Sequence, residues 1–113
     1  MPVLKPKATL SDFQTYVREL EIERGFTNEG LVDKCLLLGE EMGELFKAVR
    51  SKTDIKMDVT ARIPNTEEEV ADVFIMLCAV ANRLGVDMEQ AFLKKEEINK
   101  TRQWKKVETK TSL

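Results

Sequence analysis

The sequence predicts a single all-α domain, and three observations support this. The chain has 113 residues, which is enough for one hydrophobic core but not for two. Hydrophobic residues make up 42% and charged residues 34%, with only five glycines and three prolines. This composition favours a helical globular protein over a disordered one. Apolar residues also recur every three or four positions in four segments, as they do along one face of an α-helix.

The first two helices follow from capping signals and apolar spacing. The first helix is expected to begin at Ser11, because Ser11 to Gln14 has the pattern of a capping box, and to end near Gly25. The second helix is expected from about Asn28 to Ser51. Its apolar residues follow a helical spacing of alternating fours and threes. They are Leu31, Cys35, Leu38, Met42, Leu45 and Val49.

A polar segment, residues 52–65, is expected to be a loop, because it contains Pro64 and several turn-forming residues. The third helix is expected to start at Thr66, with Thr66 and Glu69 as the ends of a second capping box. Gly85 follows the last apolar residue of this segment and predicts the end of the helix there.

The fourth helix is expected to start at Asp87, with Gln90 at the reciprocal capping position, and to reach about Lys105. Residues 1–8 have the composition of an arm, and residues 106–113 are expected to be a frayed tail. No repeat or linker divides the chain, so residues 1–113 are expected to form one domain.

Net charge and hydropathy give no sign of two classes of partner, nucleic acids and membranes. The net charge of −2 gives no indication of binding to nucleic acid or to an anionic membrane. The longest apolar run, residues 73–81, is much shorter than the ~20 residues that a membrane span needs. No signal peptide is recognisable at the start of the chain, and a cytoplasmic location is expected.

Cysteine and histidine content narrows the chemistry further. Cys35 and Cys78 both lie among apolar residues of helical segments, and buried free thiols in a reducing cytoplasm are expected for both, with a disulfide or a redox role as the alternative. The chain contains no histidine. Serine–histidine–aspartate triads, HExxH zinc sites and Glu-x-x-His di-iron bundles are therefore excluded.

Two acidic clusters carry most of the functional information. The first is Glu40-Glu41-Met42-Gly43-Glu44, and the second is Glu69-Val70-Ala71-Asp72. Each places two carboxylates three residues apart on a helix, roughly 5–6 Å apart at Cβ, where like charges repel. Two such pairs on neighbouring helices indicate a cation between them. Ligands that are all oxygen favour a hard ion such as Mg²⁺.

Helical geometry distinguishes the acidic residues from one another. At about 100° per residue, Glu41 and Glu69 lie roughly 80° from the centre of the apolar stripe of their helices, and Glu44 and Asp72 roughly 140°. Glu40 lies almost opposite its stripe, which indicates a supporting or solvent-facing group. A solvated acidic face, with Glu69 as a helix cap, is the alternative interpretation for these residues.

The fourth segment adds a basic feature. Lys95, Asn99 and Arg102 occupy the same angular sector as the apolar residues at the start of this helix. Polar groups on an inward-facing stripe are costly unless they are paired. They either form structural salt bridges with the acidic clusters or bind an anionic ligand beside the metal. Their donors suit phosphate oxygens.

Taken in order, these motifs resemble a known family. The run Glu40 to Leu45, the run Glu69 to Val73, the turn from Leu84 to Asp87, and the Lys95, Asn99 and Arg102 helix are similar to the MazG-like branch of the all-α nucleoside triphosphate pyrophosphohydrolases. The match covers about residues 10–105. The resemblance implies a MazG-like bundle of four to five helices that is completed by oligomerisation, as a homodimer or as a tetramer built from two dimers.

The resemblance also implies an activity and roles for individual residues. Such an enzyme cleaves a (d)NTP substrate between its α and β phosphates and releases a monophosphate and pyrophosphate. The implied ligands of Mg²⁺, with Mn²⁺ as a substitute, are Glu41, Glu44, Glu69 and Asp72. The implied catalytic carboxylates are Glu40, Glu41 and Glu44, with Glu40 orienting or deprotonating water. Lys95, Asn99 and Arg102 would hold phosphates, and Phe26 would line the base pocket, with Phe13 and Tyr16 also available.

Two alternatives stay open. One is a sister activity with the same metal ligands, either phosphoribosyl-ATP pyrophosphohydrolase or a dUTP- or dCTP-specific enzyme. The other is a non-catalytic helical interaction module, which would show no dependence on metal. Neither nucleic acid nor a membrane is expected as a partner.

Overall fold

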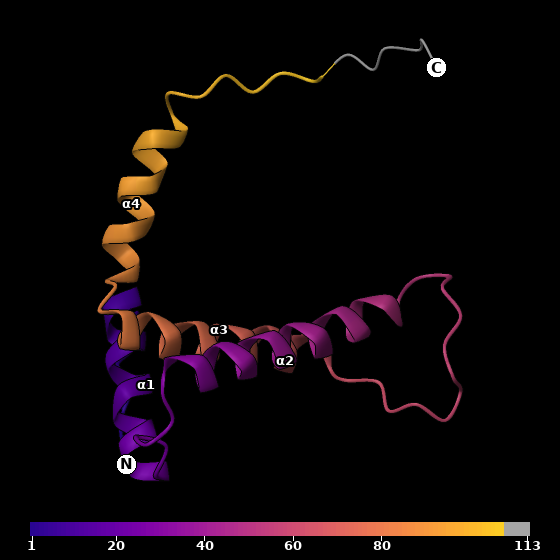
Figure 1. The fold of residues 1–113 in the computed structure, drawn as a ribbon, viewed down its shortest axis with the longest axis horizontal. Helices are drawn as coiled ribbons and strands as arrows, with labels where there is room; N and C mark the ends of the chain where they lie inside the picture. Colours follow the sequence, from indigo (N-terminus) through magenta and orange to yellow (C-terminus); the bar gives the residue numbers. More distant parts are fainter. Residues whose placement is uncertain (108–113) are drawn as a thin grey trace.

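Four α-helices make up the regular structure of residues 1–107, which the computed structural model describes. They are α1 (Leu10–Arg24), α2 (Leu31–Arg50), α3 (Thr66–Leu84) and α4 (Met88–Asn99). The described residues contain no strand, so the predicted all-α class is confirmed. Helix α3 packs against both α1 and α2, and α4 packs against α1. Helices α1 and α4 lie one after the other along one direction, and the α2–α3 pair extends to the side of them (Figure 1). Helix α4 and the α2–α3 pair therefore form different arms of the molecule.

The start of α1 differs from its prediction. Thr9, not Ser11, is the N-cap: its hydroxyl accepts from the backbone N–H of Asp12 at 3.2 Å, and the Asp12 carboxylate accepts from the Thr9 N–H at 2.8 Å. This reciprocal pair satisfies two of the free N–H groups at the helix start. At the other end, Gly25 adopts φ 78°, which suits glycine and ends the helix as predicted.

Helix α2 begins later than expected. It starts at Leu31 rather than near Asn28, because Gly30 has extended backbone geometry and its N–H donates to the Asp33 carboxylate at 2.9 Å. The C-terminal end agrees with the prediction, since Ser51 is the C-cap. Residues 52–65 form turns and bends, so the expected loop is confirmed.

Helix α3 begins at Thr66 as predicted, but its capping residue is Asn65. The Asn65 side chain accepts from the backbone N–H of Glu68 at 3.1 Å, so the expected box between Thr66 and Glu69 does not form. The end of the helix is as predicted, with Gly85 in the left-handed region at φ 67°.

Helix α4 is shorter than predicted. Asp87 is its N-cap and accepts from the Gln90 N–H at 3.0 Å, as expected. The helix ends at Asn99, however, and not near Lys105, so Arg102 follows the helix instead of lying on it. The expected frayed tail falls mainly on residues 108–113, which lie outside the described residues.

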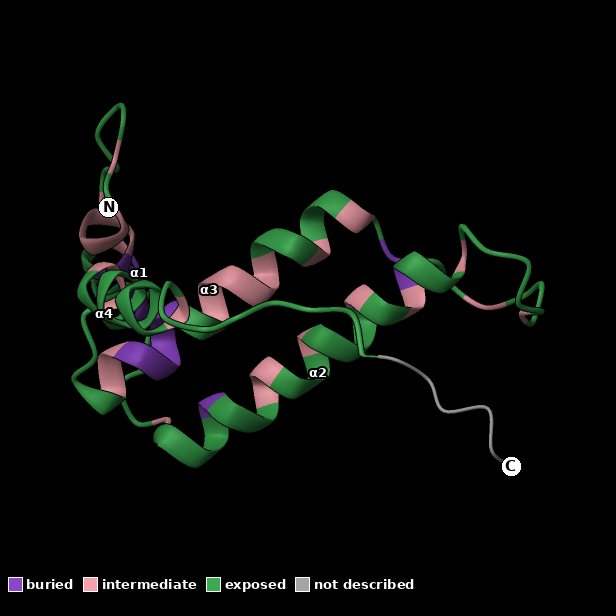
Figure 2. Ribbon diagram, turned by 90° about the horizontal axis from the view of Figure 1, so that it is seen from above, coloured by how far each residue is buried: buried purple, intermediate pink, exposed green. Residues whose placement is uncertain are grey.

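The hydrophobic core lies where α1 crosses α3. It is built around Val17, Cys78 and Ala79, and the half-buried rings of Phe13 and Phe74 meet edge to face with their centroids 5.5 Å apart. Buried positions concentrate at this crossing, whereas α2 and α4 are largely exposed (Figure 2). The core is therefore small, and the apolar stripe of α2 is only partly covered by α3.

The two cysteines have different environments. Cys78 is fully buried in this core, and burial raises the pKa of its thiol to about 11. Cys35 is exposed on α2, so the prediction of a buried thiol is correct for Cys78 and wrong for Cys35. The reason is that α2 packs mainly against α3, which leaves this face uncovered. Both cysteines are free.

Polar contacts join α1 to the α3–α4 connection. The amide nitrogen of Gln14 donates to Asn82 Oδ1 at 3.1 Å and to the carbonyl of Val86 at 2.7 Å. Its Oε1 accepts from the backbone N–H of Met88 at 2.9 Å. One buried side chain thus fixes the turn from which α4 departs.

A second polar cluster ties the α1–α2 turn to α3. The Arg83 guanidinium makes two parallel hydrogen bonds to the Glu21 carboxylate and also donates to the carbonyls of Glu29 at 2.9 Å and Ala79 at 3.0 Å. The buried Lys34 ammonium contacts Glu29 Oε1 at 2.8 Å. These bonds fix where α2 begins relative to α3.

Among the described residues, no helix combines the length and apolar character needed to cross a membrane.

We predict that Glu21→Ala lowers the free energy of unfolding by about 3 kcal/mol. The substitution leaves the largely buried Arg83 guanidinium without its carboxylate, and removal of one partner from a buried ion pair is costly. Urea unfolding followed by circular dichroism measures the change. Glu19→Ala, an exposed position on the same helix, is the control and should change stability by less than about 0.5 kcal/mol. Equal losses in the two variants would contradict the structural role of the pair.

Candidate metal centre

Carboxylates from two helices meet between α2 and α3. Glu41 of α2 and Glu69 and Asp72 of α3 each offer an oxygen, and these oxygens lie within 4.8 Å of one another. Glu69 and Asp72 are three residues apart, so both face the same side of α3, where α2 packs. Helix packing thus brings together one residue of the first acidic cluster and both of the second.

Electrostatic strain is concentrated on Glu41. Burial raises the pKa of its carboxyl from the ordinary 4.5 to about 7, and the neighbouring carboxylates of Glu69, Asp72 and Glu40 raise it further. Without a cation, the Glu41 carboxyl therefore holds a proton well above the pH range in which a glutamate normally ionises.

One oxygen of the cluster has no partner. Glu69 Oε2 is buried from solvent and makes no hydrogen bond within the described part of the chain. A buried carboxylate oxygen without a donor is costly unless a cation binds it. Oxygen ligands alone, held close together and partly desolvated, fit a hard divalent cation such as Mg²⁺ or Mn²⁺.

The carboxylates line an open pocket of about 320 Å³. The lining residues are Glu40, Glu41, Glu44, Lys47, Arg62, Pro64, Asn65, Glu68, Glu69 and Asp72. All five acidic residues that the sequence singled out are therefore in one place. Glu44 and Glu40 line the pocket but lie outside the three-carboxylate cluster.

Three charged residues of the pocket were not among the predicted site residues. Lys47 lies three residues after Glu44, so helical spacing alone could have placed it on the same side of α2. Glu68 lies directly before Glu69 at the start of α3. Arg62 comes from the loop before α3, where no periodicity indicates the direction of a side chain.

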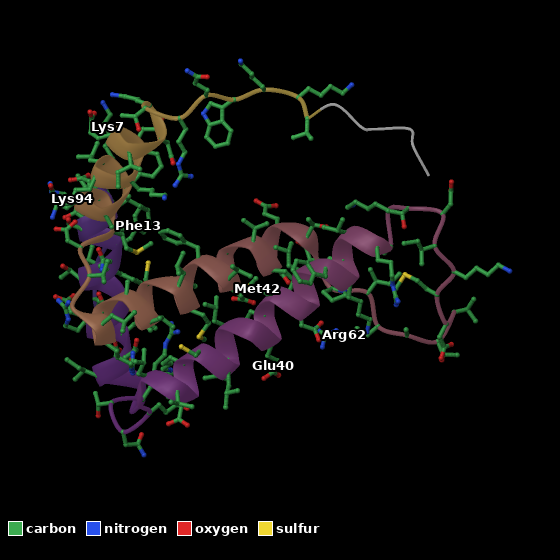
Figure 3. All side chains as sticks on the ribbon, turned by 45° about the horizontal axis from the view of Figure 1, so that its top comes forward. Lys7, Phe13, Glu40, Met42, Arg62 and Lys94 are labelled. Carbon is green, nitrogen blue, oxygen red and sulfur yellow. The ribbon has the colours of Figure 1, made fainter. Side chains whose placement is uncertain are left out.

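The basic residues of the fourth segment lie elsewhere. Lys95 and Asn99 line an apolar groove of about 440 Å³ between α3 and α4, and Arg102 is exposed after the end of α4. Figure 3 shows Arg62 and Glu40 together beside α2, whereas Lys94 of α4 lies on the other arm of the molecule. Within one chain, the structure does not bring the α4 residues to the carboxylate pocket.

Asn99 and Phe26 were both predicted to bind the substrate, and the structure places them in different surroundings. Asn99 Oδ1 is buried without a hydrogen-bond partner among the described residues. Phe26 lies in the α1–α2 turn, 40% exposed, with its ring centroid 4.9 Å from Lys34 Nζ. It does not line the carboxylate pocket, and of the other aromatic candidates Phe13 packs in the core.

Comparison with known proteins agrees with this arrangement. The model of the MazG nucleotide pyrophosphohydrolase domain matches residues 31–105, which include both acidic clusters. The chain is 34% identical over 102 residues to human dCTP pyrophosphatase 1, covering 86% of this chain and 60% of that protein. The chain thus spans about 60% of the length of the curated relatives that it matches.

Two solved structures share the fold. The iMazG protein from Vibrio DAT 722 has a TM-score of 0.64 at 29% identity, covering 82% of this chain and 99% of that one. The MazG-like pyrophosphohydrolase of cyanophage S-2L has a TM-score of 0.66 at 28% identity, covering 89% and 87%. The cyanophage protein is bound to dGDP and to three catalytic Mn²⁺ ions per active site. This chain belongs to the MazG nucleotide pyrophosphohydrolase domain family.

Proposed function

We propose that this protein is a metal-dependent nucleoside triphosphate pyrophosphohydrolase that cleaves a (d)NTP between its α and β phosphates. The observation that carries the proposal is the group of three carboxylates from α2 and α3, with one buried oxygen left without a partner. Family membership and the metal-bound, nucleotide-bound cyanophage relative support the same activity. The products would be a nucleoside monophosphate and pyrophosphate.

The cluster would hold Mg²⁺, or Mn²⁺ in its place, through Glu41, Glu69 and Asp72, with Glu44 at the edge of the same pocket as a further ligand. When bound, the metal supplies charge neutralisation for the phosphate oxygens and activation of water. The cyanophage relative holds three ions, and the additional carboxylates of this pocket, Glu40, Glu44 and Glu68, are consistent with more than one ion here.

The proposed reaction is the hydrolysis of one phosphorus–oxygen bond by water. The oxygen of water attacks the phosphorus on one side of the α–β bridge, the bond from that phosphorus to the bridging oxygen breaks, and the water proton passes to a carboxylate. The chain has no histidine, which leaves a carboxylate or a metal-bound hydroxide as the candidate base. We assign this role to Glu40, which lines the pocket next to Glu41 but lies outside the three-carboxylate cluster.

The second candidate function is hydrolysis of dCTP in particular. The human and mouse relatives are dCTP pyrophosphatases, but this chain spans only part of their length. The proposal is therefore for a (d)NTP in general, with dCTP as the first nucleotide to compare with the others.

An assembly of two or more copies is part of the proposal. In the described chain, no residue of α4 is buried, and the large apolar side chain of Phe92 is 64% exposed. Phe92 lines an apolar groove that runs between α3 and α4. A homodimer, or a tetramer built from two dimers, would cover this surface. It could also bring Lys95 and Asn99 of one copy to the carboxylate pocket of another.

We predict that the wild-type chain releases pyrophosphate from at least one of dCTP, dATP, dGTP and dTTP in the presence of Mg²⁺. Asp72→Asn should lower kcat more than about a hundredfold, because loss of a ligand should exceed the ten- to hundredfold effect of residues behind the ligands. Ion chromatography separates pyrophosphate from orthophosphate. Release of orthophosphate alone would contradict cleavage at the α–β bridge.

A matched control keeps this result interpretable. Glu67→Gln removes an exposed acidic residue of the first turn of α3 that does not line the pocket. It should retain wild-type turnover. If Glu67→Gln and Asp72→Asn lose activity equally while both remain folded, the metal site is not at this pocket.

We predict that the metal-free protein becomes less stable as pH rises from 5 to 8. The folded pKa of Glu41, about 7, exceeds its ordinary value of 4.5, so the folded state binds more protons between these values and stability falls as they are lost. Glu41→Gln cannot ionise and should show a flatter profile. Thermal unfolding with a chelator measures both proteins.

Addition of Mg²⁺ gives the complementary result. Metal binding requires ionised carboxylates, so Mg²⁺ should raise the Tm of the wild-type protein more at pH 8 than at pH 5. The effect should be smaller in Glu41→Gln. An equal rise in Tm at the two pH values would argue against Glu41 as a ligand.

We predict that Phe92→Glu weakens self-association at least tenfold. The exposed aromatic ring lines the groove between α3 and α4, and a charge placed in an apolar interface is costly to desolvate. Sedimentation velocity over a dilution series measures the change. Lys94→Glu, an exposed α4 position outside the groove, is the control. A wild-type chain that is monomeric at every concentration would exclude the assembly.

A further inference from the structure

Two cations face the carboxylate pocket without being paired to it. Lys47 projects from α2 and Arg62 from the loop before α3, and both line the pocket that six carboxylates also line. Throughout the described residues, the ion pairs within 4.0 Å involve other groups, and neither Lys47 nor Arg62 takes part in one. Their donors are therefore available to a ligand.

A lysine or arginine that only offset the acidic cluster would gain most by direct contact with a carboxylate. Arg83 shows the difference in the same molecule, because its guanidinium is fully engaged with Glu21 and with backbone carbonyls. Arg62, by contrast, makes no hydrogen bond to another side chain or to the backbone of the described chain.

The pocket needs donors of this kind. Carboxylates repel a polyphosphate, and a bound cation satisfies only some of the phosphate oxygens. Lys95 and Asn99 of α4 do not reach the pocket of their own chain, since they line the groove between α3 and α4. Lys47 and Arg62 are the basic residues that one described chain places at its own carboxylate pocket.

We propose that Arg62 and Lys47 bind the phosphate oxygens of the substrate on the side that leaves as pyrophosphate. The Arg62 guanidinium presents paired N–H donors that match two phosphate oxygens, and the Lys47 ammonium adds a point charge to the lining of the same pocket. The inference deepens the proposed function and rests on it for the identity of the substrate. It assigns phosphate binding to the same chain that supplies the carboxylates.

The competing role makes a different prediction. If Arg62 acted only by lowering the repulsion among the carboxylates, its removal would strengthen binding of a divalent cation and leave phosphate affinity unaffected. If it contacts phosphate, its removal weakens binding of the anion. Separate titrations with the metal alone and with inorganic pyrophosphate distinguish the two roles.

The experiment is calorimetric titration of the full chain, first with Mn²⁺ alone and then with inorganic pyrophosphate in saturating Mg²⁺. Arg62→Ala should weaken pyrophosphate binding about ten- to hundredfold, as expected for loss of a charge-assisted hydrogen bond, without weakening Mn²⁺ binding. Lys47→Ala should weaken pyrophosphate binding by a smaller factor. Arg62→Lys should recover only part of the loss, because lysine cannot bind two oxygens at once.

The matched control is Lys56→Ala, which removes a cation from the same loop that does not line the pocket. It should bind pyrophosphate as the wild type does, and equal melting temperatures would show that all variants are folded. Wild-type affinity for pyrophosphate in Arg62→Ala, or an equal loss in Lys56→Ala, would overturn the inference. So would a wild-type chain that does not bind pyrophosphate at all.

Turnover separates this inference from the proposed function. If the wild type hydrolyses a (d)NTP and Arg62→Ala keeps the same KM and kcat, the inference fails and the function stands. If the wild type binds pyrophosphate through Arg62 but hydrolyses none of the four dNTPs, the function fails and the phosphate site stands.

Discussion

Repulsion among carboxylates is the constraint on which the rest of this structure depends. Packing of α2 against α3 brings Glu41, Glu69 and Asp72 within 4.8 Å of one another, at a place where burial already disfavours charge. The packing of α2 against α3 and the proton that Glu41 retains up to a pH of about 7 offset this repulsion in the absence of a cation. Local instability of this kind is typical of sites selected for binding rather than for stability.

Much of the fold could be predicted because its signals are local. Gly85 and Asp87 mark the end of α3 and the start of α4 through backbone geometry and capping that neighbouring residues determine. The start of α1 was misplaced because Thr9 and Ser11 are both good capping residues, and only the position of Asp12 decides between them. The early end of α4 was missed for another reason. That helix has little tertiary packing to sustain it, and a repeating pattern alone does not show this.

The same distinction between local signals and long-range contacts applies to the candidate site. The carboxylates could be predicted because helical spacing fixes which residues share a face, and all five line one pocket. The direction of α4 depends on the turn that Gln14 holds, a contact between residues far apart in the sequence, so the separation of Lys95 from the carboxylates could not be foreseen. Arg62 lies in a loop, where side-chain direction follows from the whole chain path rather than from a repeat.

The unequal environments of the two cysteines have a practical consequence. Cys35 is exposed on α2, less than two helical turns before Glu41, whereas Cys78 is enclosed in the core with its thiol pKa raised to about 11. A maleimide dye or spin label should therefore attach at one position of the unaltered protein. The natural sequence thus offers a single spectroscopic reporter on the helix that carries half of the metal centre, and two labelled copies would allow the distance between chains to be measured in an assembly.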